Sequence, residues 1–243
     1  MENLIEHPAN WLVAHRGDRA GGVENTLAAF SHAITAGARF AECDIQFTRD
    51  MMPVVLHDNW LKRLCHNPAA KVINLELAEL YDVCLPNFEL LTLDRLLAWL
   101  ELQAGVTLFI EIKATVRRRT TDRSIARRLT RHIPDSLLDK VVLISKSGDI
   151  LDACKAAFAA HRLRIGWVAE GNSLPVSDID YIFMPYEDME TFHRWQNRGV
   201  KVGLYTINDV ELATEMRRLG ADLIESDHFS HLLGELDAGH DEG

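Results

Sequence analysis

Short, almost continuously apolar runs alternate along the chain with longer stretches whose apolar residues recur at helical spacing. Runs of the first kind are typical of strands buried on both faces, and helical spacing places apolar side chains on one face of a helix. The alternation therefore predicts an α/β protein with a parallel sheet. The predicted strands are residues 11–15, 40–47, 107–113, 140–145, 163–168, 180–184, 200–206 and 221–226.

The segments between these runs predict the helices. In residues 25–37, apolar side chains fall at Leu27, Phe30 and Ile34, and Gly37 follows as a helix-stop residue. Eight strand–helix units favour a closed TIM-type (β/α)₈ barrel over an open doubly wound sheet, and the glycine-rich G-x-G-x-x-G loop of the open sheets is missing from the sequence. Similar helical patterns occur at 91–105, 121–133, 149–161 and 209–221.

The length of the chain agrees with one barrel. It has 243 residues, and a barrel of this type typically needs ~250. We therefore predict a single barrel domain over residues 1–235. Residues 236–243 are acidic, contain glycine and have few large apolar side chains, so we predict a disordered tail there.

One segment departs from the alternation. The apolar run at 53–58 follows the run at 40–47 too closely for a parallel crossover, which needs a dozen or more residues. It is predicted to fold back as a β-hairpin through Arg49–Met52, which sets His57 roughly opposite Asp44. Residues 58–90 then form a small insertion after the second strand of the barrel.

Composition narrows the possible partners and compartment. The formal net charge of −10 makes nucleic acid an unlikely ligand, because the phosphate backbone would be repelled. The start of the chain has no apolar signal region, and no apolar stretch can cross a bilayer, so we expect a cytoplasmic protein without a stable membrane anchor. Four scattered cysteines without a C-x-x-C motif suggest free thiols in a reducing compartment: Cys43, Cys65, Cys84 and Cys154. The sequence leaves the oligomeric state open.

Charged residues stand inside two of the apolar strands. Glu42 and Asp44 are two apart and so share one face of their strand, and the same holds for Glu111 and Lys113. Buried salt bridges are the alternative explanation, but catalytic groups of this fold gather at the carboxyl ends of the strands, where these residues lie. Three carboxylates without a cysteine ligand form a hard oxygen site, which suits one Mg²⁺ or Ca²⁺ ion, with Mn²⁺ as a further option.

Two histidines follow strands on the same predicted face. His15 ends the first strand and His57 ends the hairpin, each beside a charged residue. A lone histidine is usually structural, but two on one barrel face are suited to general acid–base catalysis, with metal ligation as the competing role. Arg16 can bind a phosphoryl oxygen through its fork of donors, and its alternative role is a surface ion pair.

An arginine run follows the third predicted barrel strand. Arg117, Arg118 and Arg119 are best explained as part of a solvated helix face. The competing hypothesis places them at the rim of the active face, where they would attract an anionic leaving alcohol. Trp60 and Trp167 are either walls of a pocket or packed residues, and packing is the favoured interpretation.

These residues also carry a resemblance. The chain contains His15-Arg16-Gly17, Glu24-Asn25-Thr26, Glu42-Cys43-Asp44, Thr48-Arg49-Asp50 and Pro53 through Asp58, in that order. In these five motifs it closely resembles the glycerophosphodiester phosphodiesterase family, in its cytoplasmic bacterial type. The likeness continues at Leu61 and Arg63 and at 110–113, 205–208 and 220–222, and is thinner after residue 113.

The resemblance implies roles for individual residues. Those matching Glu42, Asp44 and Glu111 hold the metal, and those matching His15 and His57 form the acid–base pair. Residues matching Arg16 and Lys113 contact the phosphate, Glu24 supports the site from the first loop, and Tyr205 stands at a substrate-binding position where the family usually has Trp. Further departures, which bear on how the two ends of the substrate are held, are Leu64-Cys65 after Arg63, Lys146 in place of Phe, and Ser226 in place of Thr.

The implied reaction is metal-dependent hydrolysis of a glycerophosphodiester to sn-glycerol 3-phosphate and an alcohol. Two alternatives remain at this point. One is a lipid-directed phosphodiesterase of the same superfamily, such as a lysophospholipase D, with the 58–90 insertion shaping an apolar channel. The other is a non-catalytic barrel that binds phosphodiesters, although every predicted carboxylate and histidine is present.

Overall fold

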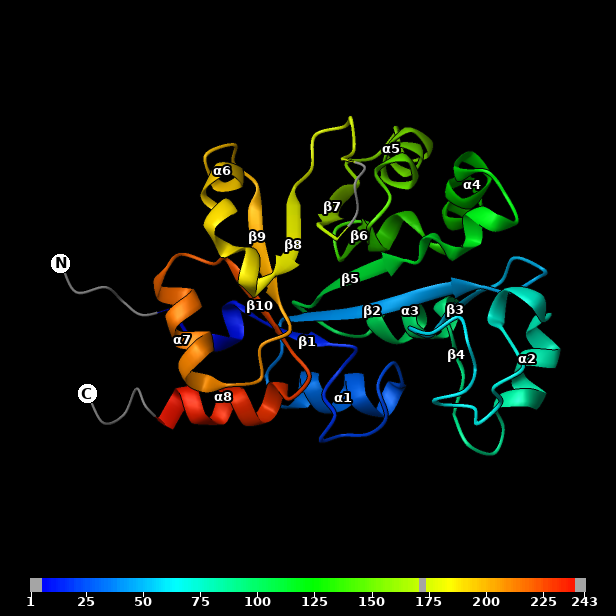
Figure 1. Ribbon diagram of the computed structural model, residues 1–243, viewed down its shortest axis with the longest axis horizontal. Helices are drawn as coiled ribbons and strands as arrows, with labels where there is room; N and C mark the ends of the chain where they lie inside the picture. The colour runs from blue at the N-terminus through cyan, green and yellow to red at the C-terminus, as the bar shows by residue number, and fades with distance from the viewer. Residues whose placement is uncertain (1–5, 171–173, 239–243) are drawn as a thin grey trace.

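The computed structural model describes residues 6–170 and 174–238, which form a closed barrel of eight parallel strands surrounded by helices (Figure 1). Strand β1 pairs with β2 on one side and with β10 on the other, which closes the barrel. The predicted TIM-type fold is confirmed, and each predicted strand is found within two residues of its expected bounds. The barrel strands are β1 (Leu12–His15), β2 (Phe40–Phe47), β5 (Thr107–Ile112), β6 (Val141–Ser145), β7 (Arg164–Val168), β8 (Tyr181–Pro185), β9 (Lys201–Tyr205) and β10 (Leu223–Ser226).

The helices cover the outside of the barrel because their apolar faces pack on the outward-facing strand residues. In α1, for example, Ala29, Phe30 and Ala33 are buried, and the side chain of Thr26 caps the helix by accepting from the backbone N–H of Ala29. A second apolar cluster fills the inside of the barrel and includes Val13 and Phe183. The outer helices are α1 (Leu27–Thr35), α3 (Leu93–Glu101), α4 (Asp122–His132), α5 (Gly148–Ala157), α6 (His193–Gln196), α7 (Val210–Arg218) and α8 (Phe229–Ala238).

The predicted hairpin is present. Strand β3 (Pro53–Val55) runs antiparallel to β2, and the two-residue strand β4 (Leu91–Thr92) continues this extension beyond the barrel (Figure 1). The register differs by one residue from the expected one. Ile45 lies opposite Val55, and the N–H of Leu56 donates to the carbonyl of Asp44 over 3.0 Å, so His57 is one residue farther along.

The insertion between β3 and β4 has a small apolar core of its own, beside helix α2 (Leu77–Cys84). Cys65 and Cys84 form a disulfide there, while Cys43 and Cys154 are free and buried. The expectation of four free thiols is therefore wrong, because the insertion brings two distant cysteines together. Cysteine usage no longer supports a reducing compartment. The core of the insertion consists of Val54, Leu56, Leu61, Cys65, Val72, Leu80, Cys84, Phe88 and Leu90.

The carboxyl-terminal segment corrects another expectation. Helix α8 continues through Ala238, and Leu236 is only 8% exposed because it packs in the outer core. The predicted disordered tail at 236–243 is therefore wrong for its first three residues, and 239–243 lie outside the described residues. Within the described ranges, the structure contains no helix long and apolar enough to span a membrane.

Candidate active site

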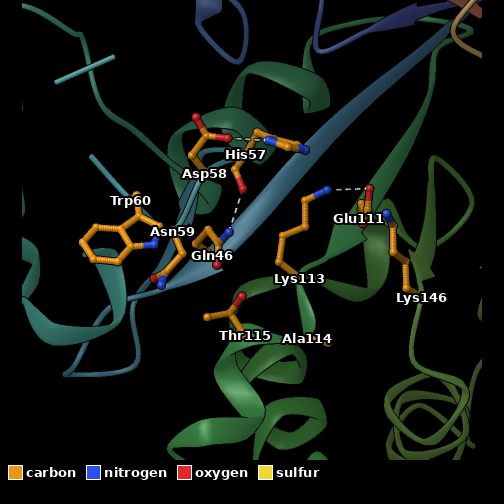
Figure 2. Close-up of a pocket in the computed structure, with 10 residues that line it drawn as sticks. All are labelled: Gln46, His57, Asp58, Asn59, Trp60, Glu111, Lys113, Ala114, Thr115 and Lys146. Carbon is orange, nitrogen blue, oxygen red and sulfur yellow. Dashed lines mark hydrogen bonds and ion pairs between the residues drawn. The ribbon is translucent and has the colours of Figure 1, made fainter. Parts of the chain in front are cut away.

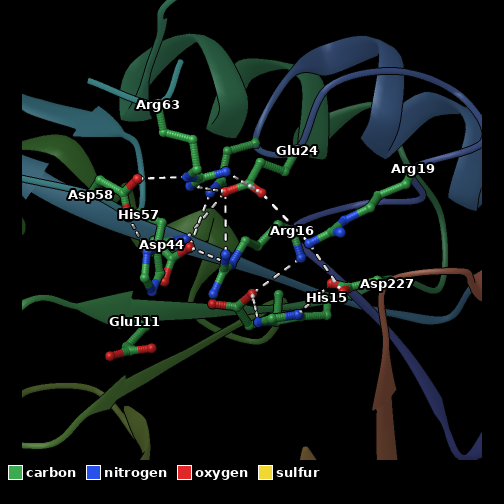
Figure 3. A network of polar contacts seen from close by, with 12 residues as sticks. His15, Arg16, Arg19, Glu24, Asp44, His57, Asp58, Arg63, Glu111 and Asp227 are labelled. Carbon is green, nitrogen blue, oxygen red and sulfur yellow. Dashed lines mark hydrogen bonds and ion pairs between the residues drawn. The ribbon is translucent and has the colours of Figure 1, made fainter. Parts of the chain in front are cut away.

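The predicted site residues meet at one end of the barrel, where the carboxyl ends of β1, β2 and β5 lie beside the hairpin (Figure 3). The parallel arrangement causes this, because all carboxyl ends of the strands face the same side. His15 ends β1, Glu42 and Asp44 lie on β2, and Glu111 lies on β5. Parallel pairing places His15 beside Glu42 and Asp44 beside Glu111.

Three carboxylates converge at this end. Glu42, Asp44 and Glu111 each offer one oxygen, and these oxygens lie within 4.8 Å of one another. Burial and repulsion by Asp44 raise the pKa of Glu42 well above its usual range. For Asp44, burial acts in the same direction, but Lys113 and Arg16 outweigh it and hold the pKa of this carboxyl well below its usual range.

The chemistry of this cluster fits a divalent cation. Within the described part of the chain, Glu42 Oε1 is buried and has no hydrogen-bond partner. An orphaned buried carboxylate oxygen is costly, and a cation would remove that cost. Lys113 already supplies positive charge, since its Nζ lies 2.6 Å from Asp44 Oδ1 and 2.7 Å from Glu111 Oε2. The all-oxygen donor set matches the preference of Mg²⁺ and Ca²⁺.

Arg16 is held by an unusual backbone. Its φ of 59° turns the chain sharply, and its N–H donates to Glu42 Oε2 over 3.1 Å. Gly17 follows at φ 85°, where a Cβ would lie 2.7 Å from the Cβ of Ala29, so glycine is required there. The guanidinium lies 3.0 Å from Asp44 Oδ2 and 3.2 Å from Glu24 Oε1. The His-Arg-Gly sequence thus fixes the guanidinium group of Arg16 beside the carboxylate cluster.

Asn25 orients Asp44, a role that the sequence analysis did not assign. Its Nδ2 donates to Asp44 Oδ2 over 3.0 Å, and its Oδ1 accepts from the backbone N–H of Asp44 over 3.3 Å. Asn25 is fully buried at φ 60°, a conformation that asparagine tolerates better than most residues. The Glu-Asn-Thr motif marks Asn25 in the sequence but does not show its contact with Asp44.

Glu24 connects the arginines instead of facing a cavity. Arg63 donates to its two oxygens over 2.8 and 2.7 Å, and Arg16 donates over 3.2 Å (Figure 3). Glu24 does not line either of the two cavities at the barrel mouth. In this geometry Glu24 holds the guanidinium groups of Arg16 and Arg63 in place, which is the supporting role that the resemblance implies.

Each predicted catalytic histidine is paired with an aspartate. His15 Nδ1 lies 2.8 Å from Asp227 Oδ1, and His57 Nδ1 lies 2.7 Å from Asp58 Oδ1. With Nδ1 engaged, Nε2 is the nitrogen available for proton transfer in both rings. Burial, assisted by Lys113 and Arg16, lowers the pKa of His57 despite the opposing effect of Asp44. Asp227 was not identified from the sequence, although it directly follows Ser226, where the family usually has Thr.

Two cavities open at this end of the barrel. The inner cavity of about 140 Å³ is lined by His15, Glu42 and Tyr205, among others. The outer cavity of about 420 Å³ lies toward the insertion, where Trp60 and Asn59 form part of its wall (Figure 2). The wall between them is common to both cavities and consists of His57, Glu111, Lys113 and Lys146.

Glu225 is a site residue that the sequence analysis missed. It lies on β10, is 4% exposed and lines the inner cavity. Burial and the nearby carboxylates raise its pKa to about 7, against the opposing effects of His15 and Arg16. The logic that singled out Glu42 and Glu111, a carboxylate inside an apolar strand, applies equally to this residue.

The arginine run does not reach the cavities. Arg117 is engaged by Asp122 over 3.0 Å and by Asp149 over 2.9 Å, and Arg119 donates to Asn74 over 2.8 Å. None of the three arginines lines either cavity at the mouth, which agrees with the solvated-face interpretation. Of the two tryptophans, Trp60 lines the outer cavity at 51% exposure, and Trp167 is buried.

Comparison with known proteins agrees with this site. The family model described as the glycerophosphoryl diester phosphodiesterase family matches residues 15–231. The molecule is thus a TIM-type barrel with a carboxylate–histidine site, and the chain belongs to the glycerophosphoryl diester phosphodiesterase family.

One curated relative is named probable glycerophosphodiester phosphodiesterase 1, from Mycobacterium tuberculosis. It is 36% identical over 129 residues, which are 48% of this chain and 46% of that protein, so the match spans about half of the relative. The remaining half of that protein is not matched.

Two solved structures share the fold. A glycerophosphodiester phosphodiesterase from Parabacteroides distasonis has a TM-score of 0.79 at 22% identity, covering 95% of this chain and 98% of the other. A phosphodiesterase from Oleispira antarctica, solved with the product sn-glycerol-3-phosphate, has a TM-score of 0.76 at 23% identity and covers 93% and 96%. At these identities the likeness concerns the fold.

Proposed function

We propose that this protein is a metal-dependent glycerophosphodiester phosphodiesterase, which hydrolyses its substrate to sn-glycerol 3-phosphate and an alcohol. The observation that carries the proposal is the meeting of three carboxylates, two histidines and two basic side chains, Arg16 and Lys113, at one barrel mouth. The carboxylate oxygens lie within 4.8 Å of one another, and both histidines line the inner cavity. The family match and the product named in the Oleispira structure support the substrate class.

Glu42, Asp44 and Glu111 would hold the divalent cation, Mg²⁺ or Ca²⁺ by their all-oxygen chemistry. When bound, such an ion polarises a phosphoryl oxygen and offsets charge that develops on it. Arg16 and Lys113 supply further positive charge to the same oxygens, and both are fixed by ion pairs with Asp44. These fixed cations bind and orient the phosphodiester.

His57 acts as the general base. Its lowered pKa keeps the imidazole neutral at neutral pH, so Nε2 can accept a proton from the attacking hydroxyl of water or of the glycerol end. The P–O bond to the leaving alcohol then breaks as the new P–O bond forms. His15, which is paired with Asp227 and lies 3.9 Å from Glu42, delivers an Nε2 proton to the leaving oxygen.

The shared wall of the two cavities orients the substrate. His57, Glu111 and Lys113 belong to both cavities, so the proposal places the phosphorus at their junction, with the leaving oxygen on the side of His15 and the rest of the alcohol directed toward the outer cavity. That cavity is lined mainly by polar and charged side chains, with Trp60 as its large apolar surface (Figure 2). The polar groups of this lining suit a small polar alcohol, whereas Trp60 and the aliphatic parts of the lysines are the surface that an acyl chain would contact.

The test is a substrate screen with purified protein. Glycerophosphocholine, glycerophosphoethanolamine and lysophosphatidylcholine are incubated with Mg²⁺ or Ca²⁺, and separately with EDTA. We expect sn-glycerol 3-phosphate from the first two substrates, little release of choline from the lysolipid, and recovery of activity when the metal is restored. Activity that persists after chelation would contradict the metal requirement, and preference for the lysolipid would favour the lipid-directed alternative.

A further inference from the structure

Two polar atoms in the inner cavity are left unpaired by the proposed mechanism. Glu225 Oε1 and the Tyr205 hydroxyl are both buried and lack a hydrogen-bond partner among the residues that the structure describes. Both residues line the inner cavity. Unpaired buried polar atoms are uncommon in folded proteins and costly, so two of them in one cavity indicate a ligand that supplies the missing hydrogen bonds.

The shape and chemistry of the cavity define that ligand. Its volume of about 140 Å³ corresponds to a handful of water molecules or one three-carbon polyol. Ile144, Val168 and Phe183 form an apolar part of the wall, and Glu225 and Tyr205 form a polar part. A ligand that fits has carbon–hydrogen bonds on one side and hydroxyl groups on the other.

We propose that Glu225 and Tyr205 form the subsite that recognises the two free hydroxyl groups of the glycerol end. The inference rests on the proposed function and adds its specificity. A carboxylate accepts from hydroxyl donors, and a phenol both donates and accepts, so the pair matches a vicinal diol. The glycerol carbons then pack against Phe183 and Val168, which directs this end of the substrate inward and the leaving alcohol outward.

A second cation is the competing occupant for Glu225. The three oxygens that come within 4.8 Å of one another belong to Glu42, Asp44 and Glu111, and Glu225 is not part of that cluster. Its neighbour Tyr205 is a weak ligand for hard cations compared with a carboxylate. The diol explains both unpaired atoms, whereas a cation on Glu225 explains one.

The experiment compares two substrates with the same leaving group. Glycerophosphocholine carries the diol, and propylphosphocholine lacks both hydroxyls. Choline release gives kcat and KM for each substrate with the wild type, Glu225→Gln and Tyr205→Phe, all saturated with Mg²⁺. We expect each variant to lower the preference for glycerophosphocholine about tenfold, mainly through KM, because a hydrogen bond to a charged or buried partner contributes on this scale.

A matched control separates this role from a general effect of removing a carboxylate. Glu170 also lines the inner cavity, but it is paired with Lys146. Glu170→Gln should change both substrates in the same proportion. Calorimetric titration with Mg²⁺ alone should give the same affinity for Glu225→Gln as for the wild type, and thermal melting verifies that each variant is folded.

The outcomes separate the two proposals. If the wild type hydrolyses neither substrate, the proposed function fails. If it hydrolyses glycerophosphocholine and both variants keep the wild-type preference, the glycerol subsite is overturned while the function stands. A loss of Mg²⁺ affinity in Glu225→Gln as large as that in Glu111→Gln would also overturn the subsite, because it would make Glu225 a metal ligand.

Discussion

The two histidines of the site are held by different regions of the molecule. His15 ends a barrel strand, and its partner Asp227 directly follows the neighbouring strand β10. The backbone N–H of Asp227 in turn donates to Asn208 over 2.9 Å, in the loop after β9. His57 stands at the edge of the insertion, and its partner Asp58 accepts from Arg63 over 2.7 Å.

The difference teaches that one arrangement, an imidazole oriented by a carboxylate, can rest on two kinds of support. The barrel holds His15 through neighbouring strands, and its side chain is 14% exposed. The insertion holds His57 through side-chain ion pairs above a small core, and the side chain of His57 is 35% exposed. We therefore expect His15 to be robust toward changes in the insertion and His57 to be sensitive to them.

The largest expected effect comes from removing either ring. His15→Ala and His57→Ala should each lower kcat by ~10²–10⁴-fold, because general acid–base catalysis is worth about that much. Circular dichroism and Mg²⁺ titration should show a folded protein that still binds metal. Near-normal kcat in one variant would mean that the two histidines do not share the reaction, and loss of metal binding would identify a ligand instead.

Removing the disulfide weakens the insertion, which holds His57, and leaves the barrel, which holds His15, intact. The double variant Cys65→Ser/Cys84→Ser releases a cross-link between positions 19 residues apart, and loops of about this length contribute roughly 3 kcal/mol to stability. We expect proteolysis within 58–90 to become faster and kcat to fall several-fold, with cleavage of the barrel unchanged. If proteolysis of the barrel and of the insertion became faster by the same factor, the two regions would not differ in how they hold their histidines.

The aspartate partners give a test by pH. The pKa of His57 lies below its ordinary value, and the hydrogen bond that its ring donates to Asp58 opposes this shift by raising the pKa. A base must be neutral to act, so kcat/KM should fall at acidic pH with a midpoint below about 6.5, the ordinary histidine value. In Asp58→Asn the midpoint should move to still lower pH. Asp227→Asn serves as the control, since it acts on the other ring and should leave this midpoint in place.

The smallest effect is expected from the arginine run. Arg117 and Arg119 are engaged by Asp122, Asp149 and Asn74, outside both cavities. Replacing residues 117, 118 and 119 together with glutamine should leave the ratio of kcat/KM for glycerophosphoserine to that for glycerophosphocholine unchanged at low and high salt. A salt-dependent loss confined to the anionic substrate would place these arginines at the rim after all.

The sequence predicted the fold because the signals for it are local and repeated. Eight apolar runs with helical segments between them specify a barrel whatever the details of each loop. It also predicted which residues meet, since Glu42, Asp44 and Glu111 stand out as charges within apolar strands. The register of the hairpin was missed by one residue because it depends on the geometry of the turn at 49–52, which no local pattern encodes.

The residues that were missed are those whose role depends on contacts across the molecule. Asp227 and Asp58 matter because of the rings they orient, and Asn25 matters because it bonds both the side chain and the backbone of Asp44. The pairing of Cys65 with Cys84 depends on how the insertion packs. Separation along the chain hides Asp227, Asn25 and the cysteine pair. Asp58 is next to His57 and Glu225 is a charge within an apolar strand, so these two had a local signal that was not used.

The closure of the barrel between its first and last strands has a consequence for the synthesis of the protein. His15 and Asp227 are 212 positions apart, yet they form one hydrogen-bonded pair. A ribosome has therefore to produce almost the whole chain before this pair can form, and the long loop must close at an entropic cost that the final strand–strand pairing offsets. A nascent chain that has already buried β2 and β5 still lacks the carboxylate that orients His15. The His15–Asp227 pair of the proposed active site and the barrel itself are thus completed together, late in folding.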